Sequence, residues 1–335
     1  MVDTVTIQFN LNYELNQFVQ KGIRKGIIPL SYQPFRNGKR QGGIYTASMF
    51  PFSSIRFDAR HGYVQIMIST VPLLGHEATS NDTSTIEEKV ISFFEGFFHT
   101  PIQYVDGITL NRIDYKVDYR VKNSIETKIF YDLLSIAPAT FNGVVKTQRK
   151  TAIKYCPKTG YIELISYDKE KELCNKLRKK SPDEIFASNE GLENYIGIIR
   201  TEIRVKNRKL NYNKKSLGLS KDLDNYLDEY SANYYFEKYV QKVWFTEPFY
   251  RIDIAISKIK NCNTLKDNMK DKLCKLVTKI NEDGISEAKK LYKNVGTFNS
   301  HIKKIRALGI NPLTFNEAYS VKVIDNFTTR GKQNG

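Results

Sequence analysis

Residues 108–119 constrain the fold more than any other part of the sequence. β-Branched and aromatic residues alternate there with charged ones, as in Arg112-Ile113-Asp114-Tyr115-Lys116. Because side chains along a strand point to opposite faces with a period of two, the pattern predicts a strand with one apolar and one charged face. Residues 199–206 repeat the pattern, and the charged side chains sharing a face there are Arg200, Glu202, Arg204 and Lys206. We therefore expect the charged faces of two strands to meet in one sheet.

The order of the elements predicts the fold class. Twice the sequence reads helix, strands, helix, strand, with helical spacing of apolar residues at 85–98 and 124–134. This predicts an α+β fold of two ferredoxin-like halves, residues 1–105 and 106–219, forming an antiparallel sheet with helices packed on it. From residue 220 to 335 the sequence is Lys-rich and amphipathic, which predicts a second, mainly helical C-terminal domain.

The charge balance narrows the class of partner. Lys and Arg number 52 against 36 Asp and Glu, giving a net charge of +16. Such an excess suits a polyanion, either nucleic acid or an anionic membrane surface. Because no transmembrane run or signal peptide is apparent, we expect a soluble protein in the cytoplasm. The 4 cysteines form no Cys-x-x-Cys pair, which predicts buried reduced thiols.

A candidate nucleophile lies between the two charged strands, at Tyr167. A tyrosine, with a pKa of about 10, becomes a useful nucleophile only when a cation, base or metal stabilises the phenolate. Lys169 is the candidate cation. Tyr115 and Tyr119 compete in principle, but alternation places them on the face opposite to Asp114, in the predicted core.

Carboxylates on the two charged strands form a candidate metal site. Asp114 and Glu202 are the first choice, with Asp118 as an optional third, because hard divalent ions prefer oxygen ligands. The implied cofactor is Mg²⁺ or Mn²⁺. The 4 histidines are scattered without a His-x-His pair, and no glycine-rich phosphate loop is present. We therefore expect neither histidine catalysis nor ATP hydrolysis.

Basic residues supply candidate DNA contacts. Residues 286–291 and 298–308, joined by a turn at 294–297, match a helix-turn-helix in length and turn chemistry. Aromatic residues after position 233 could stack on bases, although at helical spacing core packing is the commoner role. The side chains that we expect to contact DNA are Arg112, Lys116, Arg200, Arg204, Lys206, Lys303 and Lys304.

These residues carry a resemblance to a known family. The start Met1-Val2-Asp3-Thr4, the segment Pro72-Leu73-Leu74-Gly75-His76-Glu77, the triplet Arg112-Ile113-Asp114, Tyr167-x-Lys169-x-x-Glu172, residues 200–206, Leu217-Gly218-Leu219 and residues 303–309 occur in the order of the filamentous-phage replication initiators. The chain resembles this gene II protein family over nearly its whole length. It is more distantly similar to rolling-circle initiators of small Gram-positive plasmids.

The resemblance implies a metal-dependent, site-specific DNA endonuclease and strand transferase. Tyr167 would become linked to the 5′-phosphate at a nicked origin, Asp114 and Glu202 would bind the divalent ion, and the enzyme would later rejoin the displaced strand. Expected partners are duplex and single-stranded origin DNA, a host helicase and a polymerase, in the cytoplasm of a bacterial host cell. Two alternatives stay open: a conjugative relaxase with the same chemistry, and a non-catalytic origin- or RNA-binding protein.

Overall fold

The computed structural model describes residues 2–32, 35–36, 39–40, 43–49, 52–101, 106–141, 144–156, 161–178 and 195–328. The chain divides into two compact units. Unit 1 consists of Met1–Lys116, Thr159–Ile162 and Arg204–Tyr234, and unit 2 of Val117–Lys158, Glu163–Ile203 and Tyr235–Gly335. The long strands β8 and β13 therefore contribute residues to both units. The predicted domain boundary at residue 220 stays a prediction.

Unit 1 is built on an antiparallel sheet with the strand order β2-β5-β6-β7-β1-β8. Its strands are β1 (Val2–Asn10), β2 (Ser31–Tyr32), β5 (Ile44–Met49), β6 (Phe52–Asp58), β7 (Tyr63–Ser69) and the first part of β8 (Asp106–Arg120), beside the small hairpin of β3 (Phe35–Arg36) and β4 (Lys39–Arg40). Its helices are α1 (Tyr13–Arg24), α2 (Thr70–Leu74), η1 (Ser80–Asp82), α3 (Thr83–Phe98), α7 (Asn207–Leu217), α8 (Asp224–Leu227) and most of α9 (Glu229–Tyr235).

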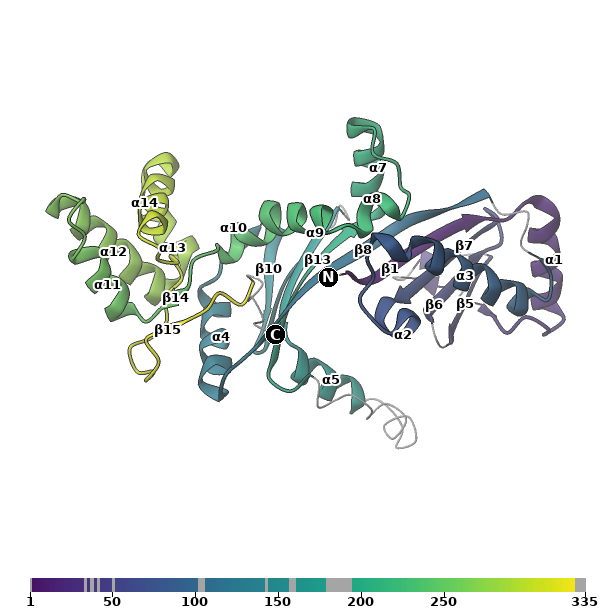
Figure 1. Cartoon of the computed structure of the whole chain (residues 1–335), viewed down its shortest axis with the longest axis horizontal. Coiled ribbons are helices and arrows are strands. Elements are labelled where there is room, and N and C mark those ends of the chain that lie inside the picture. Colours follow the sequence, from purple (N-terminus) through teal and green to yellow (C-terminus); the bar gives the residue numbers. More distant parts are fainter. Residues whose placement is uncertain are drawn as a thin grey trace. The chain divides into compact units, whose positions relative to one another are not determined.

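Alternation along the strands decides which face of this sheet is covered. In β7 the side chains of Val64, Ile66 and Ile68 are fully buried, while the residues between them are partly exposed. Phe94 of α3 packs edge-on against Phe9 of β1, with ring centroids 5.4 Å apart, and Figure 1 shows α3 lying along these strands. The connection β1-α1-β6-β7-α3-β8 with the order β6-β7-β1-β8 is the ferredoxin-like arrangement.

Unit 2 repeats the same kinds of element with the strand order β13-β12-β11-β10-β9. The elements are α4 (Ser124–Ile136), β9 (Thr140–Phe141), β10 (Val144–Arg149), β11 (Ala152–Tyr155), β12 (Ile162–Asp168), α5 (Lys169–Leu177) and β13 (Ile198–Lys206). Lys146 caps the C-terminal end of α4, because its Nζ donates hydrogen bonds to three carbonyl oxygens there at 3.0 to 3.1 Å.

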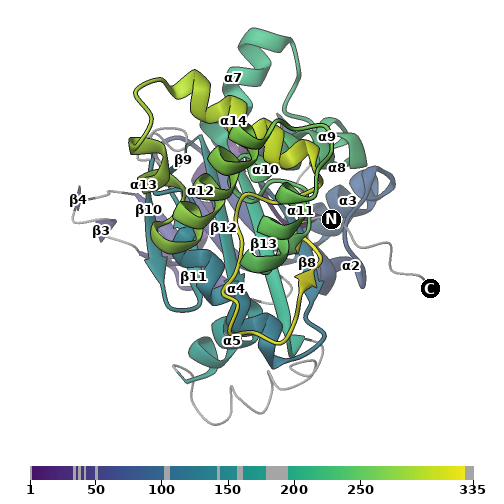
Figure 2. The same ribbon diagram turned by 90° about the vertical axis from the view of Figure 1, so that its left-hand side faces the viewer.

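The C-terminal part of unit 2 is mainly helical. It contains η3 (Phe236–Val240), α10 (Gln241–Trp244), β14 (Phe249–Tyr250), α11 (Ile252–Lys260), α12 (Asp267–Asp283), α13 (Ile285–Lys290), α14 (Val295–Ala307) and β15 (Val323–Ile324). Figure 2 shows α11, α12 and α14 grouped together in this unit. The ring of Phe327 packs against Trp244, Phe249 and Phe130 with centroids 4.8, 5.0 and 5.1 Å apart. Because Phe130 belongs to α4, the C-terminal region and the second half share one core.

The predicted fold class is confirmed: the protein is α+β, with antiparallel strands, packed helices and a mainly helical C-terminal region. None of the described helices has the length and apolar character needed to cross a bilayer. The expectation that the cysteines are buried is wrong for Cys156, whose side chain is exposed and donates to Glu163 at 2.7 Å. Cys174, Cys262 and Cys274 are partly buried.

Candidate active site around Tyr167

Tyr167 lies at the end of β12 and is hydrogen-bonded to β13. Its hydroxyl donates to Glu202 Oε1 at 2.5 Å, and both residues are buried, with 8% and 3% exposure. The neighbouring pair Ser166 and Thr201 joins the same two strands through their hydroxyls, 2.9 Å apart. The alternating side chains of two adjacent strands thus bring a phenol and a carboxylate together inside unit 2.

Burial and the Glu202 carboxylate raise the pKa of the Tyr167 hydroxyl well above its ordinary value, and Arg200 opposes them. The tyrosine is therefore a neutral phenol in the resting protein. Its reactivity requires that a base accept the proton as the oxygen attacks, and Glu202 already accepts its hydrogen bond.

Arg200 places a buried positive charge beside this pair. It is 3% exposed, and its Nε and Nη2 donate to the two carboxylate oxygens of Asp118 at 2.6 and 2.7 Å. Such a two-point bond fixes the plane of the guanidinium group. Asp118, predicted as an optional metal ligand, is thus the partner that orients Arg200.

Lys169 provides a second cation close to Tyr167. Strand β12 ends at Asp168 and Lys169 is the first residue of α5, so the side chains of Tyr167 and Lys169 do not lie on one face of an extended strand. Lys169 Nζ nevertheless lies 5.8 Å from the centre of the Tyr167 ring and 3.0 Å from Glu172 Oε2. The Lys-x-x-Glu spacing of the tyrosine motif therefore forms an ion pair on the first turn of the helix.

Asp114 lies in unit 1 and is held by two arginines. Arg112 Nε donates to Asp114 Oδ1 at 2.7 Å and a second nitrogen of Arg112 contacts Oδ2, while Arg204 Nε lies 3.3 Å from Oδ2. The Asp114 side chain is 2% exposed, and those of Arg112 and Arg204 are 26% and 25% exposed. The charged faces of β8 and β13 do meet, and their charges are paired across the strands.

These pairings do not suit the predicted metal site. Mg²⁺ and Mn²⁺ bind carboxylates whose negative charge is available, whereas Asp114 and Asp118 are bonded to guanidinium groups and Glu202 to a phenol. Within the described part of the chain, no three His, Cys, Asp or Glu side chains are gathered so that they could hold a metal ion. The residues as arranged do not fit the ion, so the divalent cofactor stays a prediction.

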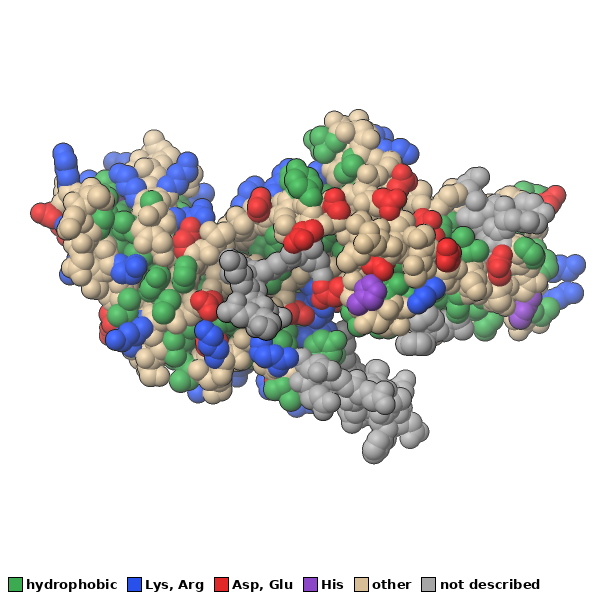
Figure 3. Space-filling model, viewed as in Figure 1, with side chains coloured by type: hydrophobic (Ala, Val, Ile, Leu, Met, Phe, Trp, Pro, Cys, Tyr) green, Lys and Arg blue, Asp and Glu red, His purple; other side chains and the backbone are tan. Residues whose placement is uncertain are grey.

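The remaining predicted DNA contacts are distributed over both units. Lys116 is buried in ion pairs with Asp3 and Glu77 at 3.4 and 3.0 Å, so its charge is compensated within unit 1. Lys206 is partly exposed at the end of β13. On α14, Lys303 is exposed and Lys304 partly exposed. Figure 3 shows Lys and Arg side chains gathered over α12 to α14.

Sequence reasoning missed two neighbours of the site. Tyr195 lies between the two cations, with its ring centre 5.5 Å from Lys169 Nζ and 5.8 Å from the Arg200 guanidinium. Trp244 of α10 donates its indole N–H to Ser166 at 2.9 Å, next to Tyr167 in the chain. Neither residue stands at a fixed spacing from the motif, so only the tertiary structure identifies them.

Comparison with known proteins adds little to this geometry. Neither a protein-family model nor a curated protein matches the sequence. Among solved structures, the rolling-circle replication initiator protein from Geobacillus stearothermophilus is similar at 10% sequence identity, over 62% of this chain and 73% of that one, with a TM-score of 0.30. A likeness this weak carries no argument about function.

Proposed function

We propose that the protein is a rolling-circle replication initiator that nicks origin DNA through a covalent tyrosine intermediate and later rejoins the displaced strand. The observation that carries the proposal is the hydrogen bond from Tyr167 to Glu202 beside the cations Arg200 and Lys169. Attack of a tyrosine on a phosphodiester requires a phenol, a proton acceptor and positive charge. The order of the sequence motifs supports the same reaction class.

In the proposed reaction the Tyr167 oxygen attacks the phosphorus of the scissile phosphodiester. The phenolic proton passes to Glu202, the bond from phosphorus to the 3′ oxygen breaks, and that oxygen takes a proton from water. The products are a 5′-phosphotyrosine bond and a free 3′-hydroxyl group. Rejoining is the reverse: a 3′-hydroxyl attacks the phosphorus and loses its proton to water, the bond from phosphorus to the Tyr167 oxygen breaks, and that oxygen regains its proton from Glu202.

The cations act on the phosphate in this scheme. Arg200, held in plane by Asp118, and Lys169, held by Glu172, balance the charge that develops on the phosphoryl oxygens. Because Tyr167 is only 8% exposed, the DNA strand must displace part of the surrounding side chains before the hydroxyl can reach phosphorus. Origin DNA is the proposed partner, and the helicase, the polymerase and the divalent ion stay predictions that no step here uses.

The direct test is to trap the covalent adduct. Wild-type protein incubated with a labelled single-stranded origin oligonucleotide, with and without Mn²⁺, should give an SDS-resistant adduct. Tyr167→Phe removes only the hydroxyl, so this variant should bind the oligonucleotide and form no adduct, while Tyr195→Phe, the matched control, should still form it.

Three results would contradict the proposal or part of it. A wild-type protein that binds origin DNA but forms no adduct under any metal condition would favour the non-catalytic binding protein. An adduct that peptide mapping assigns to Tyr195 would keep the reaction class and reject Tyr167. Cleavage of a conjugative transfer origin instead of a replication origin would favour the relaxase.

A further inference from the structure

The polar face of the unit 1 sheet is a second surface with the chemistry to bind nucleic acid. We call it the open face and define it by Gln8 on β1, Arg56 on β6, Tyr63 and Gln65 on β7, and Asn111 and Arg112 on β8. Register places Arg56, Gln65 and Gln8 directly opposite one another across three strands. The residues that alternate with them, such as Phe57, Ile66 and Ile7, are fully buried in the core.

Amide side chains form a connected row at the centre of the open face. Gln8 Oε1 accepts hydrogen bonds from Gln65 Nε2 and from Asn111 Nδ2, both at 2.9 Å. These two bonds orient the three amides, and each amide carries further donor or acceptor atoms. Oriented amides suit the edges of unpaired bases, which present both donors and acceptors.

Cations and one aromatic ring flank the amide row. The Arg56 guanidinium lies 6.0 Å from the centre of the Tyr63 ring and 3.9 Å from Asp58 Oδ2, and its side chain is 23% exposed. Among the described residues, the buried Nε of Arg56 has no hydrogen-bond partner. On the other side of the row Arg112, 26% exposed, contacts Asp114 and the Met67 sulfur. Guanidinium groups favour phosphate, and a partly exposed tyrosine favours stacking with a base.

We propose that the open face binds single-stranded DNA. A flat sheet cannot enter the groove of a duplex, whereas it can lie against splayed bases and their phosphates. The face from β6 to β8 crosses four strands, or about 14 Å at the usual strand spacing, and four-stranded sheets of this kind bind about two or three bases. In replication initiation this face would hold the DNA strand next to the nick, and this part of the inference rests on the proposed function.

The test is binding of a short fluorescein-labelled oligo(dT) to the full-length protein, measured by anisotropy. Tyr63→Ala removes the stacking ring and should weaken binding about tenfold, while Tyr63→Phe keeps the ring and should bind as the wild type does. Arg56→Gln should lower the salt slope by about 0.7, the value for one phosphate of a single strand that is no longer neutralised. Tyr13→Ala and Arg24→Gln on α1 are matched controls, since Tyr13 is 76% exposed and neither residue is on the open face.

The outcomes separate this inference from the proposed function. Circular dichroism first verifies that each variant is folded. If Tyr63→Ala does not fold, Arg56→Gln is the test variant and Tyr63→Phe is its control. Wild-type affinity and salt slope in Tyr63→Ala and Arg56→Gln would overturn the open face as a binding surface, even if the adduct with Tyr167 forms. Loss of oligo(dT) binding in these variants, with no adduct in the wild type, would support the open face and reject the proposed reaction.

Discussion

At the scale of single residues, each carboxylate of the candidate site has a specific partner, whether it is buried, as Asp114 and Glu202 are, or exposed, as Asp118 is. Asp118 orients Arg200, Glu202 accepts the bond of Tyr167, and Asp114 joins Arg112 to Arg204. A buried charge is tolerated only when it is paired and hydrogen-bonded. The pairs therefore explain how the charges of Asp114, Glu202 and Arg200 are tolerated at 2%, 3% and 3% exposure.

The first prediction concerns Asp114. Asp114→Asn removes the negative charge between two arginines, so we expect a loss of stability of about 3 kcal/mol, the cost of breaking a buried ion pair. Because the loss of stability is structural, added Mn²⁺ should not restore any nicking that the variant loses with it. Thermal unfolding and nicking with EDTA, Mg²⁺ and Mn²⁺ measure both effects. Asp267→Asn is the control, since the Asp267 side chain is 95% exposed, and recovery of nicking by Mn²⁺ would instead support Asp114 as a metal ligand.

The second prediction concerns the pH dependence of stability through Glu247. Burial opposes its ionisation, but bonds from Arg306 at 2.8 and 3.0 Å hold the pKa of Glu247 below its ordinary value of 4.5. A carboxyl with a lowered folded-state pKa stabilises the protein above its unfolded pKa and loses that contribution as pH falls through the folded value.

We therefore expect Glu247→Gln to be less stable than the wild type at neutral pH by about 1 kcal/mol, a value reduced for partial solvent screening. The difference should shrink as pH falls below the ordinary pKa of 4.5 and disappear below the lowered pKa of Glu247 in the folded protein. Urea unfolding at several pH values measures it, with the exposed Glu88→Gln as control. A deficit that is independent of pH would show that Glu247 acts through packing alone.

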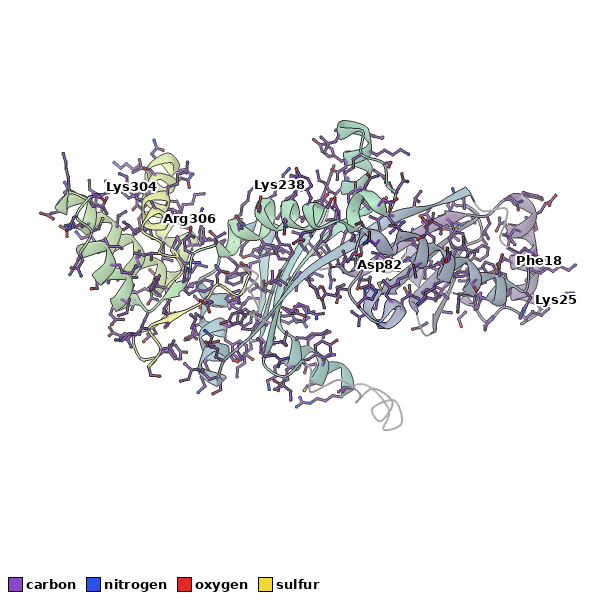
Figure 4. All side chains as sticks on the ribbon, in the orientation of Figure 1. Phe18, Lys25, Asp82, Lys238, Lys304 and Arg306 are labelled. Atoms are coloured by element: carbon purple, nitrogen blue, oxygen red, sulfur yellow. The ribbon has the colours of Figure 1, made fainter. Side chains whose placement is uncertain are left out.

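At the scale of elements, α13 (Ile285–Lys290) and α14 (Val295–Ala307) are the two helices that the sequence predicts, but α14 begins within the predicted turn at 294–297. Asn294 begins α14 by accepting the N–H of Gly296 at 2.6 Å, as expected for an N-cap residue. The buried face of α14 carries Phe298, Ile302 and Ile305, which leaves Lys303 on the exposed side. Figure 4 shows Lys304 and Arg306 on the same helix. Arg306 donates hydrogen bonds to Glu247.

The third prediction follows for duplex DNA. Replacing Lys303 and Lys304 by Gln should weaken binding to duplex origin and lower the salt slope by about 0.9 for each phosphate that is no longer neutralised. Binding of single-stranded oligonucleotide and adduct formation should persist. The control replaces Lys21 on α1 and Lys25, the residue that follows this helix, which removes the same charge elsewhere. An equal loss of affinity in both double variants would mean that net charge, and not α14, governs duplex binding.

At the scale of the whole molecule, the C-terminal region completes a core that also contains the nucleophile strand. Trp244 is fully buried, donates to Ser166 on β12 and packs against Phe327. Unit 2 therefore combines residues on both sides of position 220. Removal of the chain after that position would expose the rings of this core, so point substitutions are the sounder way to separate its functions.

The fourth prediction tests this shared core. Phe327→Ala removes a ring that is 1% exposed and should cost about 3 to 5 kcal/mol of stability, as large-to-small core changes do. Adduct formation should fall at temperatures where unit 2 unfolds, which a thermal melt and a nicking assay on the same samples measure. Phe18→Ala is the control because Phe18 is 45% exposed on α1. Full nicking by Phe327→Ala above its melting temperature would show that the site folds without this core.

The sequence by itself determined the local structure. Period-two alternation identified β8 and β13, helical spacing identified α3, α4 and α14, and the order of elements predicted the α+β class. These features depend on neighbouring residues, which a sequence displays directly. It also singled out Tyr167, Glu202, Arg200 and Asp118 before any contact between them was known.

Only the tertiary structure decided how those residues are paired. Alternation assigns a charged residue to a face, but the register between strands determines whether its neighbour is an arginine, a phenol or another carboxylate. That register brought arginines to Asp114 and Asp118 and Tyr167 to Glu202, in place of a cluster of carboxylates for a metal. Tyr195 and Trp244 joined the site through long-range packing, for which spacing along the chain provides no signal.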